Sequence, residues 1–222
     1  MKIQVGPKHD RRFLNFILPQ IPNFSNPILK KLYFKTNYIL INGNKIGCLV
    51  SGGIDSAILY FLLLEENINT GNKFQITPYT ILRIGAETPA RNVINWIHQY
   101  YGLPKTDLNI VGDPTLPQIE QVDSGFKQIL GKEVDFIYMG IIADRPEHYV
   151  NWFKYEFKET FYFRYPLLHL EKSHVIDLFV QKNVLDLIRL TTSCNDGQLA
   201  CGTCNGCNAR RWGFEQLNID PL

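Results

Sequence analysis

The most constraining feature of this sequence is a glycine-rich junction between two apolar runs, in CLVSGGIDSAILYFLLL at residues 48–64. The first run ends at Val50, and a helix-like run begins near Ser56. The two glycines between them allow a tight turn and a close approach of the backbone to a ligand. The first amide groups of a helix, together with its dipole, attract anions. The order of strand, glycine turn and helix therefore predicts a phosphate-binding turn.

The other residues of this turn point to a nucleotide and a metal ion. Ser51 and Ser56 offer hydroxyl donors, whereas Asp55 would repel a phosphate and instead suits Mg²⁺ or the orientation of loop amides. No lysine follows the glycines, which excludes the Walker pattern G-x-x-x-x-G-K-[ST]. An ordinary helix cap is the alternative, but a cap needs only one such residue. The expected nucleotide-binding set is Val50, Ser51, Gly52, Gly53, Ile54, Asp55 and Ser56.

The rest of the chain alternates strand-like and helical patterns. Strand-like runs lie at residues 45–50, 74–84, 108–112 and 134–141, and helical patterns at 56–66, 89–102, 115–130 and 174–188, the last broken near Asn183. This alternation predicts an α/β fold, with a Rossmann-like, mostly parallel sheet and helices on both faces.

The N-terminal segment, residues 1–44, is expected to be an extension of the domain. It carries several prolines and a candidate short helix at residues 11–18. Asn42-Gly43 lies between two apolar runs, and this dipeptide is a strong signal for a β-hairpin because both residues tolerate a positive φ. We therefore expect a hairpin across these two residues.

Four of the five cysteines crowd together near the C-terminus, at Cys194, Cys201, Cys204 and Cys207. In a reducing compartment such a cluster indicates metal binding rather than disulfides. Four thiolates complete a tetrahedral zinc site and leave no open position, so the expected zinc is structural. Iron–sulfur ligation also uses C-x-x-C-x-x-C runs and is the alternative. Residues 191–222 are expected to form a small zinc-binding subdomain.

Charge and hydropathy exclude several classes of protein. The net charge of +2 gives no electrostatic case for a dedicated, stable nucleic-acid binder. No apolar run reaches the roughly 20 residues that a bilayer requires. His9 to Arg12 is charged where a signal peptide would have its apolar core. We expect a cytoplasmic protein that binds no membrane.

Two segments, residues 45–56 with the SGGIDS turn and residues 165–222 with Lys172 and the four cysteines, resemble the 7-cyano-7-deazaguanine synthase family of the ATP pyrophosphatase (PP-loop) superfamily. SGGIDS resembles the superfamily's S-G-G-x-D-S pyrophosphate loop. YPLLHLEKSHVIDLF, which contains Lys172, resembles the family's P-L-x-x-x-x-K-x-x-[IV] segment. The C-terminus resembles S-C, a spacer, C-G-x-C-x-x-C-x-x-R-x-x-G-F and D-P, which includes Arg210. LRIGAETPAR at residues 82–91 departs from the family's D-Y-G-Q-R-H and matches it at Gly85 and Arg91.

The resemblance implies an adenine nucleotide alpha hydrolase-like fold, with the PP-loop ATP-binding domain at residues 45–190. It implies a ligase that uses ATP and Mg²⁺ to adenylate the carboxylate of 7-carboxy-7-deazaguanine. Ammonia, supplied as ammonium, would give an amide, and a second activation would give the nitrile of the queuosine pathway, with release of AMP and pyrophosphate. The family also implies a homodimer.

Catalytic roles are expected for Asp55, Ser56 and Lys172, and a ligand-binding role for Arg210. Lys172 would neutralise charge on the α-phosphate, or would be a solvated lysine at the start of a helix. Arg210 would lie near the substrate carboxylate, or on the surface. The alternatives for the whole chain are adenylation of another acceptor, in deazaguanine–protein conjugation or tRNA modification, and a non-catalytic nucleotide-binding module.

Overall fold

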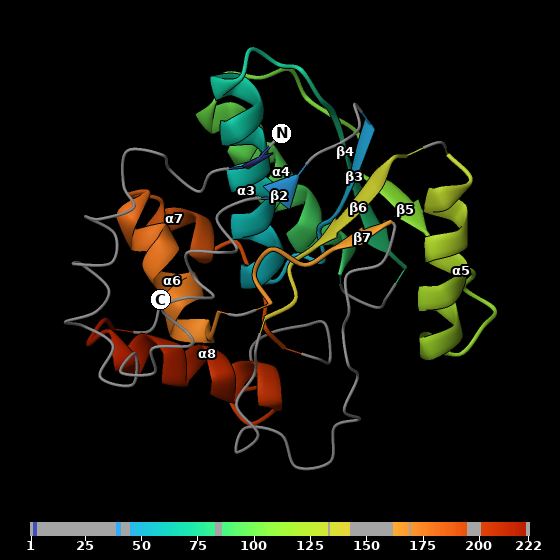
Figure 1. Ribbon diagram of the computed structural model, residues 1–222. Helices are drawn as coiled ribbons and strands as arrows, with labels where there is room; N and C mark the ends of the chain where they lie inside the picture. Colours follow the sequence, from blue (N-terminus) through green and yellow to red (C-terminus); the bar gives the residue numbers. More distant parts are fainter. Residues whose placement is uncertain are drawn as a thin grey trace.

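The fold is built on a five-stranded, wholly parallel sheet (Figure 1). The computed structural model of the 222-residue chain describes residues 2–3, 39–40, 45–82, 86–132, 134–142, 162–168, 170–194 and 201–220. The strands are β3 (Lys45–Leu49), β4 (Gln75–Ile81), β5 (Asn109–Val111), β6 (Phe136–Met139) and β7 (Phe163–Arg164), in the order β5-β4-β3-β6-β7. The short strand β7 was not expected from the sequence.

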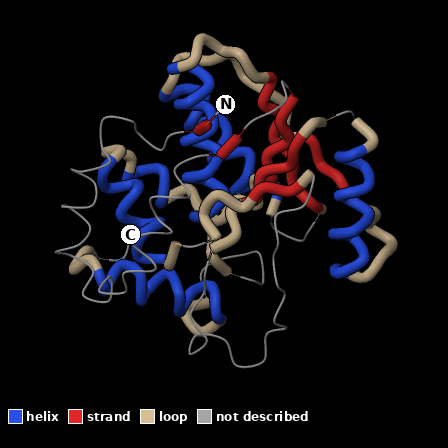
Figure 2. The backbone as a smooth tube through the Cα atoms, in the orientation of Figure 1, coloured by secondary structure: helices blue, strands red, loops and turns tan. Residues whose placement is uncertain are grey.

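Helices cover both faces of this sheet, as expected for an α/β fold. The helices α3 (Ile54–Asn69) and α4 (Glu87–Tyr100) pack on one face, and α5 (Gln118–Leu130) packs on the other (Figures 1 and 2). Almost every residue of α3 between Ser56 and Leu64 is buried, because this helix lies between the sheet, α4 and α6. A helix that is apolar on all sides belongs in the core of a domain.

The expected hairpin across Asn42-Gly43 is wrong. The strand before it, β2 (Ile39–Leu40), pairs antiparallel with β1 (Lys2–Ile3) in a separate sheet. Both edges of β3 are already taken by β4 and β6. The apolar run of β3 is buried and therefore occupies the centre of the sheet, which outweighs the local turn signal. Residues 41–44 and the candidate helix at 11–18 lie outside the described residues.

The C-terminal half adds three helices beside α3, namely α6 (Lys172–Gln181), α7 (Leu185–Ile188) and α8 (Asn205–Gln216). Asn183, with a φ of 56°, separates α6 from α7 as the sequence predicts. Gly213 of α8 faces α6, and a Cβ there would lie 2.7 Å from Ile176 Cδ1. The cysteine-bearing segment is thus packed closely against the domain. No helix in the described ranges is long and apolar enough to cross a membrane.

The strand order creates a crevice at the centre of the sheet. From β3 the chain moves outward through β4 to β5, then crosses back to β6 on the other side of β3. Connections that leave neighbouring parallel strands toward opposite faces open a crevice at the carboxyl ends of those strands, where α/β proteins bind ligands. The turn after Val50 and the residue Gly140 after β6 both lie at this edge.

Candidate active site

Two glycines allow the backbone to close around the first turn of α3. Gly52 has a φ of 77°, and a Cβ there would lie 2.6 Å from Pro89 Cβ and 2.8 Å from Ala90 N. A Cβ on Gly140 would lie 2.7 Å from Asp55 C. Because a side chain at either position would collide with another backbone, only glycine fits where α4, β6 and the turn converge.

The serines of the turn form a small hydrogen-bond network. Ser51 N donates to Ser56 Oγ at 3.1 Å, and Ser56 Oγ donates to Gly53 O at 3.0 Å. The N-cap residue of α3 is Gly53, and no side chain among the described residues caps this end of the helix. The network therefore fixes the turn and leaves the helix N-terminus open to an anion.

Lys172 forms an ion pair with Asp55. Its Nζ lies 2.8 Å from Asp55 Oδ1 and 2.6 Å from Oδ2, although the residues are 117 positions apart. The side chains are 10% and 22% exposed, so the alternative of a solvated lysine is wrong. The packing of α6 against α3 and α8 carries this amine to the turn. A cation is thus held where a phosphate group would approach.

A second connection joins the turn to the segment that precedes the cysteines. Thr192 N donates to Gly52 O at 2.9 Å. Arg210 anchors this segment, since its guanidinium donates to Thr191 O at 3.1 Å and to Ile188 O at 3.0 Å. The expected ligand-binding residue Arg210 is therefore engaged with carbonyl groups of the protein, and burial lowers the pKa of its guanidinium.

The structure brings the four predicted metal ligands together. The sulfur atoms of Cys194, Cys201, Cys204 and Cys207 all lie within 4.8 Å of one another. A tetrahedral zinc site with Zn–S bonds of about 2.3 Å has sulfur atoms about 3.8 Å apart, so the donor set fits such an ion. Backbone hydrogen bonds from Thr203 and Cys204 lower the pKa of Cys201 to about 6, which favours the thiolate. Burial raises the pKa of Cys207 to about 11.

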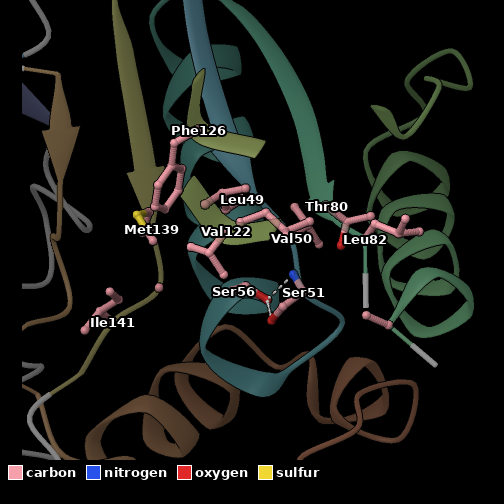
Figure 3. Close-up of a pocket in the computed structure, with 13 residues that line it drawn as sticks. Leu49, Val50, Ser51, Ser56, Thr80, Leu82, Val122, Phe126, Met139 and Ile141 are labelled. Atoms are coloured by element: carbon pink, nitrogen blue, oxygen red, sulfur yellow. Dashed lines mark hydrogen bonds between the residues drawn. The ribbon is translucent and has the colours of Figure 1, made fainter. Parts of the chain in front are cut away.

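A cavity of about 450 Å³ opens beside the turn (Figure 3). Ser51 and Ser56 form part of its lining, and Thr80, whose hydroxyl group is buried, is a third lining residue of this kind. The remaining wall is apolar and comes from all three central strands and from α5, including Leu49, Val50, Leu82, Val122, Phe126, Met139 and Ile141. The cavity therefore combines a hydroxyl-bearing region next to the helix N-terminus with an apolar compartment.

Apart from Val50, the residues of this apolar wall were not predicted from the sequence. Residues 115–130 showed the amphipathic pattern of a helix, but such a pattern does not reveal which strands the apolar face covers. Val122 and Phe126 reach the cavity because α5 packs on β4 and β5.

Comparison with known proteins finds a family match in the C-terminal third of the chain. Residues 145–218 match the family model described as queuosine biosynthesis protein QueC. A 7-cyano-7-deazaguanine synthase of Cellvibrio japonicus is 42% identical over 67 residues, which cover 28% of this chain and 29% of that protein. 7-cyano-7-deazaguanine synthase 2 of Desulfitobacterium hafniense is 32% identical over 114 residues, covering 44% and 48%. The chain spans less than half of the length of these curated relatives.

Among solved structures, the U34-tRNA thiolase NcsA of Methanococcus maripaludis, with its [4Fe-4S] cluster, aligns with a TM-score of 0.46. Its sequence identity is 14%, over 88% of this chain and 80% of that chain. The family match covers Lys172, Arg210 and the cysteine cluster, and the S-G-G-x-D-S turn lies against the same segment through Thr192. Residues 145–218 of this chain are thus similar to the queuosine biosynthesis protein QueC family, and the relatives that match part of the chain are 7-cyano-7-deazaguanine synthases.

Proposed function

We propose that this chain is an ATP-dependent ligase that converts 7-carboxy-7-deazaguanine into 7-cyano-7-deazaguanine, with ammonium as the nitrogen source. One observation carries the proposal, namely the Asp55–Lys172 ion pair at the S-G-G-x-D-S turn, which joins the two segments that resemble the family. The printed names of the relatives from C. japonicus and D. hafniense support the choice of substrate.

The cavity and the turn suit the two halves of ATP. The purine base would occupy the apolar compartment, and the triphosphate would lie against Ser51, Ser56 and the N-terminus of α3. Asp55 is the carboxylate that would hold Mg²⁺, an ion that takes one or two carboxylates together with phosphate oxygens. Such an ion would neutralise charge on the departing pyrophosphate. The cysteine cluster would hold zinc in a structural role.

Adenylation is required because a carboxylate oxygen is a poor leaving group. As the bond between the α- and β-phosphates breaks, negative charge grows on the leaving pyrophosphate. The Ser51 and Ser56 hydroxyls and the α3 amides would stabilise that charge. Lys172, held by Asp55 in the free protein, would turn to the α-phosphate when Mg²⁺ takes the carboxylate.

The chemistry would then run twice at the same site. Ammonia displaces AMP from the acyl-adenylate and leaves an amide. The amide oxygen then attacks a second ATP, and loss of AMP with two N–H protons leaves the nitrile. The proposal places the enzyme in the cytoplasm, where the thiols of the cluster stay reduced, and a homodimer remains a prediction.

A different acceptor is the second candidate. The stretch at residues 82–91 departs from the family pattern, and it follows Thr80 at the edge of the cavity. In the described part of this stretch, Arg91 lies on α4 and pairs with Glu87. A changed segment at this place would change the acceptor while the ATP chemistry stays the same.

One reaction separates these candidates. Purified protein is mixed with ATP, Mg²⁺, ammonium and 7-carboxy-7-deazaguanine, and the products are read by mass spectrometry with Asp55→Asn as the control. Nitrile and AMP formed by the unchanged protein alone support the proposal. AMP with an amide or a protein adduct, and no nitrile, favours a different acceptor. ATP left intact favours the non-catalytic module.

A further inference from the structure

Thr80 carries a buried hydroxyl group without a partner at the wall of the cavity. The residue is 2% exposed, and its Oγ1 makes no hydrogen bond within the described part of the chain. A buried hydroxyl that has lost water and gained no partner destabilises the free protein. Valine has nearly the same shape and would fill the same space without that cost. The hydroxyl at this position therefore points to a partner that the free protein lacks.

The position of Thr80 indicates which part of a ligand it would meet. Val50 N donates to Tyr79 O at 2.7 Å, which places Thr80 beside Val50 on the neighbouring strand. Figure 3 shows Thr80 next to Val50 and Leu82, apart from the linked pair Ser51 and Ser56. Two hydroxyls thus lie at the phosphate-binding turn, and the third belongs to the apolar compartment.

We propose that the Thr80 hydroxyl is a base-contacting group that hydrogen-bonds the purine of the bound nucleotide. This inference rests on the proposed binding of ATP in the cavity and extends it to a residue outside the S-G-G-x-D-S turn. An apolar compartment holds a purine by shape, and polar groups within it fix the orientation of the ring. Among the cavity-lining side chains named above, Thr80 alone provides such a group away from the turn.

Thr80→Val and Thr80→Ser form a matched pair of variants. Valine keeps the branched shape and deletes the hydroxyl, whereas serine keeps the hydroxyl and deletes the methyl group. Isothermal titration calorimetry with Mg²⁺ would measure two ligands, α,β-methylene-ATP and inorganic tripolyphosphate. The second ligand has the phosphates without the base. Thermal unfolding of the free proteins would report whether the hydroxyl serves the fold itself.

The inference predicts that Thr80→Val binds α,β-methylene-ATP roughly five- to tenfold more weakly, as the loss of one neutral hydrogen bond requires. Its affinity for tripolyphosphate stays unchanged, and its unfolding temperature is equal to or above that of the unchanged protein. Thr80→Ser binds α,β-methylene-ATP within about twofold of the unchanged protein, because the hydroxyl remains.

Several results would overturn the inference. If Thr80→Val binds α,β-methylene-ATP with unchanged affinity, the Thr80 hydroxyl makes no hydrogen bond to the purine. An equal loss for both ligands would assign the effect to the turn rather than to the base. A lower unfolding temperature would mean that the hydroxyl has a partner within the protein, and failure of Thr80→Ser would assign the effect to side-chain shape. If the unchanged protein binds neither ligand, the proposed function itself fails, together with this inference.

Discussion

Lys172 Nζ contacts both carboxylate oxygens of Asp55, at 2.8 and 2.6 Å, and so joins the start of α6 to the start of α3. Both side chains are largely buried, so removal of one charge leaves the other desolvated and unpaired. The pair also lies at the turn proposed to bind ATP. Its disruption should therefore affect stability and chemistry together.

We predict that Lys172→Met lowers the free energy of unfolding by about 1–3 kcal/mol and abolishes AMP formation. In a double-mutant cycle with Asp55→Asn, measured by urea unfolding, the two substitutions should be coupled by about 1–3 kcal/mol. Lys182→Met is the matched control, because Lys182 forms a comparable pair with Glu65 away from the turn. That control should lose stability and keep its activity. Additive effects in the cycle would contradict the pairing.

Gly52→Ala should prevent ATP binding. The substitution places a Cβ 2.8 Å from Ala90 N and also requires a residue with a side chain at a φ of 77°. Gly71→Ala provides the control, because Gly71 has a φ of 80° with nothing within 4 Å of the added Cβ. The control should lose about 1 kcal/mol of unfolding free energy, and Gly52→Ala at least about 1 kcal/mol more. Equal losses and normal ATP affinity would show that α4 does not restrict the turn.

Removal of the metal from the cysteine cluster should weaken ATP binding at the turn around Gly52, although the cluster is not part of that turn. The cysteine cluster fixes the segment around Cys194, and Thr192 in that segment holds Gly52 O. Elemental analysis is expected to find one zinc ion per chain. Chelation, or Cys201→Ser, should reduce the affinity for Mg²⁺–ATP measured by calorimetry, and added zinc should restore it after chelation. Metal-free protein that binds ATP normally would contradict this coupling, and a brown protein containing iron would replace zinc with an iron–sulfur cluster.

Asp177 should make the protein less stable as the pH rises from about 4 to 6. Burial raises the pKa of this carboxyl from 3.8 to about 6, while a hydrogen bond from Gln181 Nε2 opposes the rise. In this window the folded state keeps a proton that the unfolded state has released, so the free energy of unfolding falls with increasing pH, by up to about 3 kcal/mol.

Asp177→Asn should flatten this pH dependence and raise stability at pH 7, because the amide remains neutral when buried. Urea unfolding at pH 4.5 and pH 7 would measure both effects. If the variant shows the same dependence on pH as the unchanged protein, the titrating group lies elsewhere.

The parts of the site that are formed by residues close together in the sequence were predicted from the sequence. The S-G-G-x-D-S turn and the four cysteines each occupy a short stretch, so residue type and spacing were enough to define them. The alternation of strands and helices likewise predicted the parallel sheet, because each element carries its own periodicity.

The contacts between distant segments could not be predicted in the same way. The pairing of Lys172 with Asp55 depends on how α6 packs beside α3, and the apolar wall of the cavity depends on where α5 crosses the sheet. The hairpin expected across Asn42-Gly43 failed for a related reason, since a local turn signal carries no information about which strands fill the edges of β3. Thr80 gave no signal in the sequence, because its burial and missing partner appear only in the folded chain.

On the proposed function, the turn from Ser51 to Ser56 directs cleavage of ATP between its α- and β-phosphates. Phosphorus NMR of a reaction with ATP, Mg²⁺, ammonium and 7-carboxy-7-deazaguanine identifies the products directly. We predict AMP and pyrophosphate in equal amounts from the unchanged protein and neither from Asp55→Asn. ADP with inorganic phosphate, or the same AMP and pyrophosphate from Asp55→Asn, would contradict it.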